Sequence, residues 1–110
     1  MTLCAVFTTV ASMEEARRLA DLALAEHLAA CVQLSAVESH FRWNGRVQRE
    51  GEVRLLFKTE ASRYRELERC LREHHPYELP AIFALPVSEA SASYAEWVKQ
   101  ESAPSGRVAK

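Results

Sequence analysis

The chain has 110 residues, of which 48% are hydrophobic and 26% charged, and its 14 Lys and Arg against 15 Asp and Glu give a net charge of −1. This length fits one domain, and the composition excludes intrinsic disorder and a coiled-coil rod. A balanced charge without Lys or Arg blocks argues against a nucleic-acid binder or a polybasic membrane anchor.

The first expected elements are a strand and a helix. Residues 2–9 form a short apolar, β-branched run that is typical of a buried strand. Ser12 and Glu15 have the spacing of a capping box, which predicts the start of a helix. Apolar residues then recur every three or four positions as far as His27 and Leu28. We expect one helix face to pack on a sheet, with His27 as a core or boundary residue of no chemical role.

Asn44-Gly45 is a strong hairpin signal, because both central residues of a type I′ turn need a positive φ. The flanking segments 31–43 and 46–58 are therefore expected to pair as antiparallel strands. Arms of about a dozen residues exceed the usual strand length of roughly 5–6 residues. We expect this central hairpin to protrude from so small a domain and to pair with a neighbour.

Two helices and an edge strand complete the chain. A second helix is expected from Ser62 until just before Pro76, because proline disfavours helical geometry in the residue that precedes it. A short run at 82–87, bounded and interrupted by prolines, predicts an edge strand, and residues 91–102 predict a last helix. The apolar side of the second helix would carry Tyr64, Leu67, Leu71 and His74.

The order of these elements predicts an α+β fold, a ferredoxin-like β-α-β-β-α-β sandwich with a C-terminal helix. We assign residues 1–103 to this single domain and expect 104–110 to be a frayed tail. Both main helices would cover one sheet face, which leaves an apolar patch on the other. We expect self-association of the chain to bury this patch.

The segment from His74 to Pro80 concentrates residues that could carry chemistry. Adjacent imidazoles at a helix C-terminus can bind a borderline metal, and Cys70 lies one turn before His74 on the same helix face. The alternatives are that Cys70 is a small core residue and that His74 and His75 only terminate the helix.

A second candidate site lies on the second arm of the hairpin. Glu50, Glu52 and Lys58 have even separations and so project from one strand face. They could form a polar pocket, or only a solvated face or an intersubunit ion pair. Trp43, beside the turn, could stack on a ligand or insert into a neighbouring subunit. We expect His40 to be a packed or exposed residue and not a ligand.

Catalytic motifs and disulfides are not indicated. The chain has three glycines, no Gly-rich phosphate loop and no His-Glu-x-x-His helix, so we expect no enzymatic activity. Cysteines at 4, 31 and 70 are an odd number in a chain with enough apolar residues for a core, which indicates a reducing compartment. Without a leader segment or a long apolar run, we expect a cytoplasmic protein and no membrane partner.

Five short motifs follow one another in the order and spacing of the CutA divalent-cation tolerance proteins, which this chain resembles over residues 3–101. The motifs are Leu28-Ala29-Ala30-Cys31-Val32, Trp43-x-Gly45, Glu50-x-Glu52, Lys58-Thr59 and His75-Pro76-Tyr77-Glu78-x-Pro80. The resemblance implies a ferredoxin-like subunit in a tight homotrimer.

The resemblance also implies a role in tolerance of divalent metals. Copper(II) or another divalent cation would bind His74 and His75. The family does not require a further ligand, and in this chain Cys70 or a carboxylate of the cleft could supply one. Some members of the family have a cysteine at the end of the first strand, where this chain has Thr8. The family's intersubunit cleft corresponds to Trp43, Glu50, Glu52, Lys58, His75, Tyr77 and Glu78. An alternative function is a trimeric signalling or adaptor module, similar to nitrogen-regulatory proteins, that binds a small molecule or a partner in this cleft.

Overall fold

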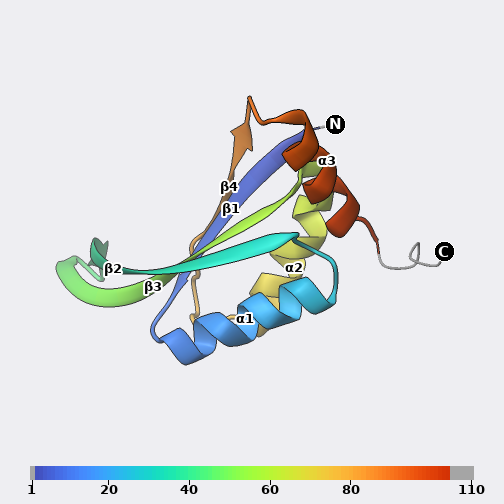
Figure 1. Ribbon diagram of the computed structural model, residues 1–110. Coiled ribbons are helices and arrows are strands. Elements are labelled where there is room, and N and C mark those ends of the chain that lie inside the picture. Colours follow the sequence, from blue (N-terminus) through green and yellow to red (C-terminus); the bar gives the residue numbers. More distant parts are fainter. Residues whose placement is uncertain (1, 105–110) are drawn as a thin grey trace.

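The computed structural model describes residues 2–104, in which the elements follow the expected β-α-β-β-α-β order with a further helix (Figure 1). The expected frayed tail, apart from Pro104, lies outside the described residues. The elements are β1 (Leu3–Val10), α1 (Met13–Ala25), β2 (Cys31–Trp43), β3 (Arg46–Glu60), the 3-10 turn η1 (Ala61–Arg63), α2 (Tyr64–His74), β4 (Ile82–Val87) and α3 (Ala92–Glu101).

The four strands form one antiparallel sheet in the order β2-β3-β1-β4. The predicted hairpin is confirmed: Trp43 pairs with Arg46, and the turn residues Asn44 and Gly45 have φ values of 52° and 77°. These values suit the type I′ turn, whose twist matches that of paired strands. The predicted edge position of β4 is also confirmed, and β2 forms the other edge.

Helices α1 and α2 lie on the same face of the sheet (Figure 1). Alternate residues of the strands point toward them, because side chains along a strand alternate between the two faces. The core is therefore built from one face of β1 and β3 and from the apolar sides of the two helices. Its largest fully buried members are Phe57, Leu19, Leu55, Leu67, Leu71, Val6 and Val10.

The ends of the two helices differ in part from the sequence prediction. Ser12 caps α1 as predicted, accepting a hydrogen bond from the Glu15 N–H at 3.2 Å. However, α1 ends at Ala25, and His27 is not on its apolar stripe. The chain turns there through a left-handed residue, with φ of 56° at His27, so that Leu28 can donate its N–H to Ala23 O.

Helix α2 ends at His74, and His75 is extended with φ of −77° and ψ of 137°, the geometry expected before Pro76. The prediction that His74 lies on the apolar side of this helix is wrong, because its side chain is exposed. Only Leu67 and Leu71 are buried on α2. His74, in the last turn, faces solvent.

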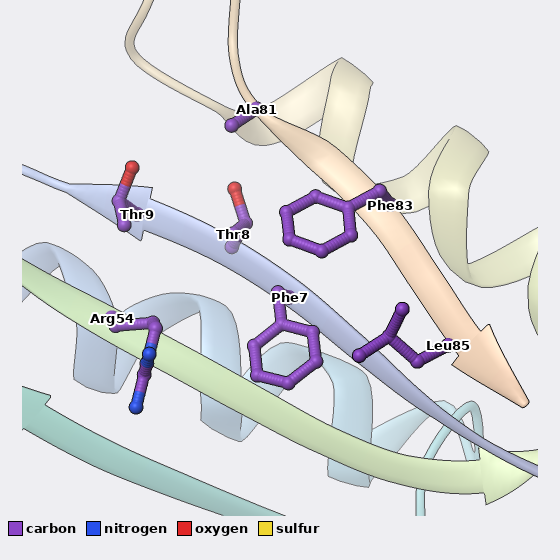
Figure 2. Close-up of a pocket in the computed structure, with 7 residues that line it drawn as sticks. All are labelled: Phe7, Thr8, Thr9, Arg54, Ala81, Phe83 and Leu85. Atoms are coloured by element: carbon purple, nitrogen blue, oxygen red, sulfur yellow. The ribbon is translucent and has the colours of Figure 1, made fainter. Parts of the chain in front are cut away.

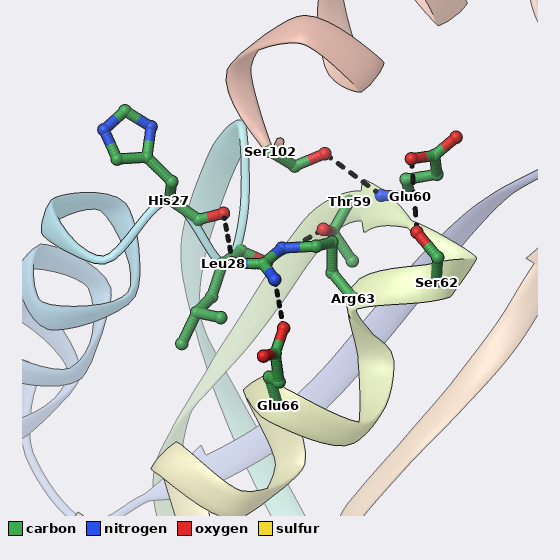
Figure 3. Close-up of polar contacts among 8 residues, drawn as sticks. All are labelled: His27, Leu28, Thr59, Glu60, Ser62, Arg63, Glu66 and Ser102. Carbon is green, nitrogen blue, oxygen red and sulfur yellow. Dashed lines mark hydrogen bonds and ion pairs between the residues drawn. The ribbon is translucent and has the colours of Figure 1, made fainter. Parts of the chain in front are cut away.

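A buried arginine ties the α1–β2 connection to the start of α2 (Figure 3). Arg63 is only 8% exposed; it donates to His27 O at 3.3 Å and forms an ion pair with Glu66. Next to it, the Thr59 hydroxyl donates to Leu28 O at 2.8 Å. These bonds satisfy the carbonyls of the left-handed turn, which would otherwise be left without partners beside the core.

The sheet face opposite the two helices carries exposed apolar side chains (Figure 2). Phe7 and Phe83 stack with their ring centroids 5.3 Å apart, and Phe83 and Leu85 remain 50% and 51% exposed. Arg54 lies over the Phe7 ring at 5.6 Å from its centroid. We call this surface the open face, defined by Phe7, Phe83, Leu85 and Arg54.

Candidate functional site

The two adjacent histidines at the end of α2 have different surroundings. His74 is exposed, and its Nδ1 lies 2.9 Å from Cys70 O in the preceding turn. Because an imidazole has two nitrogens, this contact leaves Nε2 without a hydrogen-bond partner among residues 2–104. His74 thus has a ring nitrogen that can accept a metal ion.

His75 uses both ring nitrogens within the protein. The Tyr77 N–H donates to Nδ1 at 3.1 Å, so the neutral ring carries its proton on Nε2. Nε2 lies 3.0 Å from Thr9 O, to which it donates, and 3.1 Å from Thr8 Oγ1. Burial lowers the pKa of His75, an effect that outweighs the bond to Thr9 O. His75 therefore joins β1 to the segment after α2 as a neutral residue.

Cys70, the third expected ligand, is half-buried and packs against the hydrophobic core. Burial raises the pKa of its thiol, and nearby Glu26 and Glu73 raise it further. A thiolate, the form that binds metals, is thus disfavoured at this position. All three cysteines are among the described residues, and none forms a disulfide.

Five of the seven expected cleft residues meet in one groove of about 850 Å³, whose lining does not include Lys58 or His75. The groove lies between the half of the β2–β3 hairpin that is next to the turn and the segment that connects α2 with β4. The five are Trp43, Glu50, Glu52, Tyr77 and Glu78, and the other lining residues are Thr9, Ser39, His40, Phe41, Gln48, Leu79 and Ala81.

A hydrogen bond fixes the centre of this groove. The Tyr77 hydroxyl donates to Glu52 Oε2 at 2.7 Å. Burial and the adjacent Glu52 carboxylate raise the pKa of Tyr77, so the phenol keeps its proton and stays a donor. Because His75 accepts the Tyr77 N–H, the same residue links the histidine to the groove.

Lys58 does not line the groove, although it shares a strand face with Glu50 and Glu52 as predicted. Six residues along a strand correspond to roughly 20 Å, which places Lys58 toward the other end of β3 from Glu52. Its ammonium lies over the Tyr94 ring of α3, 5.7 Å from the centroid. Within one chain, Lys58 therefore belongs to a different surface.

Sequence reasoning overlooked several groove residues. Ser39 and Phe41 pair with Glu50 and Gln48 in the hairpin register, so the Asn-Gly turn could have placed them on the same face. His40 bonds Glu38 at 2.7 Å and is exposed, as expected. Thr9 and Ala81 enter only through the tertiary fold, for which the sequence carries no local signal.

A preformed metal centre is not found in the described part of the chain. Among residues 2–104, no three His, Cys, Asp or Glu side chains lie close enough together to hold one ion. His74 retains a free ring nitrogen, whereas His75 is fully bonded and Cys70 is held as a thiol. The residues fit a cation that exchanges with solvent, and they do not fit a resident, fully coordinated metal.

Comparisons with known proteins agree with the fold and the motifs. Residues 4–101 match the family described as CutA1 divalent ion tolerance protein. The Thermus thermophilus divalent-cation tolerance protein CutA is 38% identical over 96 residues, covering 86% of this chain and 93% of the relative. The solved structure of the periplasmic divalent cation tolerance protein CutA from Archaeoglobus fulgidus superposes with a TM-score of 0.89, at 28% identity, covering 91% of this chain and 98% of that one.

Some relatives are longer than this chain. The Arabidopsis thaliana protein CutA, described as chloroplastic, is 37% identical over 95 residues, which cover 86% of this chain but 52% of the relative. The chain thus spans about half the length of this plant protein. No helix in residues 2–104 is long and apolar enough to cross a membrane.

Proposed function

Because the chain belongs to the CutA1 divalent ion tolerance protein family, we propose that it acts in divalent-cation tolerance as a cytoplasmic homotrimer without catalysing a reaction. In this proposal it holds copper(II) or another divalent cation reversibly through His74, with Cys70 as a second ligand. The observation that carries the assignment is the contrast between the two histidines. Of these two residues, only His74 has a free ring nitrogen at the surface.

The exposed position of His74 supports exchange of the cation with solvent. Copper(II) binds imidazole nitrogen well, and a single exposed imidazole leaves the remaining coordination positions to water or to other groups. The raised pKa of Cys70 means that its thiol must release a proton before it binds. Both features favour weak, reversible binding of the kind that buffers a metal.

Three features of the fold support the trimer. The open face exposes Phe83 and Leu85, and contiguous apolar surface of this kind is typical of interfaces. Strand β2 is an edge strand of 13 residues, whose unpaired backbone groups can bond to another chain. The hairpin also extends beyond the body of the molecule, whose long dimension is 51 Å (Figure 1).

The test is a copper(II) titration against a competing chelator, on tag-free protein at pH 7.5, with light scattering at micromolar concentration to determine the mass. We expect His74→Ala to weaken copper binding about tenfold or more, and His75→Ala to leave it nearly unchanged. His40→Ala, which removes an exposed histidine elsewhere, is the matched control. Unchanged affinity in His74→Ala would refute the metal assignment, and a monomeric mass would refute the trimer.

A further inference from the structure

An arginine of α1 lies at the end of α2, next to the proposed cation site. Arg18 Nη2 donates to His74 O at 2.9 Å. The two residues are 56 positions apart in the sequence, so only the folded chain brings them together. An arginine has five N–H donors, and this bond uses one of them. The guanidinium is therefore held beside His74 with further donors available.

No carboxylate of the chain neutralises this guanidinium. Arg18 takes part in no ion pair within residues 2–104, although Glu14 lies one turn before it on α1. The residue is exposed. A guanidinium binds carboxylates with two parallel N–H donors, a geometry that lysine cannot provide. Arg18 can thus bind a carboxylate that comes from solution.

A cation on His74 leaves coordination positions that the chain does not fill. Within residues 2–104, no third His, Cys, Asp or Glu side chain joins His74 and Cys70 around one ion. Copper(II) favours a tetragonal arrangement of nitrogen and oxygen donors, for which two protein ligands are too few. Ligands from solution must complete it. A small molecule with carboxylates can bind the cation and the guanidinium at the same time.

The charge of Arg18 favours the same kind of ligand. Bond lengths from the Arg18 contact through His74 to its Nε2 place a bound ion within roughly 12 Å of the guanidinium. This distance is close to the Debye length of about 10 Å at 0.1 M salt, so the two charges interact. Arg18 repels a cation that keeps its full charge, whereas carboxylates on the cation cancel that charge.

This place lies away from the surfaces proposed for assembly. Helices α1 and α2 cover the face of the sheet opposite the open face (Figure 1). Arg18 and His74 are both exposed residues of these helices. Assembly through the open face and the backbone edge of β2 uses neither side chain.

We propose that the site takes up its divalent cation as a complex with a small carboxylate chelator of the amino-acid kind. The cation binds His74 Nε2, and a carboxylate of the chelator pairs with Arg18. The inference rests on the proposed cation site at His74 and names the form in which the cation binds there. Arg18 selects the complex and the imidazole holds the cation.

The experiment compares two copper(II) complexes that each leave one coordination position for an imidazole. Iminodiacetate supplies one nitrogen and two carboxylates, whereas diethylenetriamine supplies three nitrogens and no carboxylate. The intact, full-length protein is titrated with each complex at low salt. Binding is followed by the copper-induced broadening of the His74 ring signals in NMR, which are assigned by their absence in His74→Ala. This measurement is specific to His74, so binding to other histidines does not enter it.

We expect Arg18→Gln to reduce the preference for the iminodiacetate complex over the diethylenetriamine complex about three- to tenfold. One exposed ion pair accounts for up to roughly fivefold, and repulsion of the doubly charged amine complex adds to it. Affinity for the amine complex should stay the same or rise in this variant, whereas a damaged site would bind both complexes more weakly. Arg17→Gln, which changes the neighbouring exposed arginine of α1, is the matched control and should keep the wild-type preference.

Two results would contradict the inference in different ways. A preference that is unchanged in Arg18→Gln would overturn the role of the chelator and leave the cation site in place. If neither complex broadens the His74 signals of the wild type, the proposed cation site fails together with the inference. Added salt should reduce the preference more in the wild type than in Arg18→Gln, and an equal reduction would also count against Arg18.

Discussion

His75→Leu tests whether this histidine supports the fold rather than binding metal. Leucine is close in size to histidine, so the substitution mainly removes polar contacts. It removes the donor to Thr9 O, the contact with the Thr8 hydroxyl and the acceptor for the Tyr77 N–H, at 3.0, 3.1 and 3.1 Å. Thr8 is buried, so water cannot readily replace its lost partner.

We expect His75→Leu to lower the free energy of unfolding by about 2 kcal/mol, since each lost hydrogen bond accounts for roughly 0.5–1.5 kcal/mol. The three contacts share two ring nitrogens, which keeps the loss at the lower end of their sum. The measurement is urea unfolding followed by circular dichroism. Both proteins must be compared at one concentration, because assembly makes apparent stability concentration-dependent.

His74→Leu is the matched control, one residue earlier in the chain. It removes only the exposed contact with Cys70 O and should lower the unfolding free energy by less than about 0.5 kcal/mol. The two variants should respond in opposite ways: His75→Leu loses stability and retains copper, whereas His74→Leu retains stability and loses copper. Equal stability losses, or a loss below about 0.5 kcal/mol for His75→Leu, would refute the reasoning.

Three further predictions follow from the fold. Burial lowers the pKa of His75 below its unfolded value of about 6.5, so its stabilising contribution is complete above that pH and declines as the pH falls toward the folded pKa. Urea unfolding from pH 7.5 to 5 should therefore show a falling free energy of unfolding, and His75→Leu should reduce that fall. Arg63→Met should lower the unfolding free energy by about 2 kcal/mol, because His27 O and Glu66 lose their donor. Thermal unfolding tests this, with Arg65→Met, which changes an exposed arginine, as the control. Phe83→Asp puts a charge on the open face and should reduce the mass in light scattering from that of the proposed trimer to that of a monomer. An unchanged mass would contradict a role of this face in assembly.

The fold was largely predictable because its signals are local or periodic. Asn44-Gly45 determined the register of the hairpin, and Ser12 determined where α1 starts. The end of α1 was not predictable, because its left-handed residue is His27 rather than the usual glycine. That turn is held by Arg63, which lies 36 residues away and comes close only in the folded chain.

The site was predictable as a set of residues but not as a geometry. Alternation along β3 indicates that Glu50, Glu52 and Lys58 share a face, yet it cannot show that Lys58 lies in contact with Tyr94 at a distance from the other two. Which side chains meet depends on the segment after α2. That segment brings the Tyr77 hydroxyl into contact with Glu52, which lies 25 positions earlier in the sequence.

The two histidines show why residue type alone does not define a metal site. Both can ligate, and their adjacency makes them similar in any sequence pattern. Pro76 requires His75 to be extended while His74 keeps the helical geometry, so the chain changes direction between them. His75 is consequently turned toward the end of β1, where Thr8 and Thr9 bind its Nε2. The Nδ1 lone pair of His75 that accepts the Tyr77 N–H cannot also bind a metal. Pro76 therefore decides, as much as the imidazoles themselves, which of the two histidines can bind a cation.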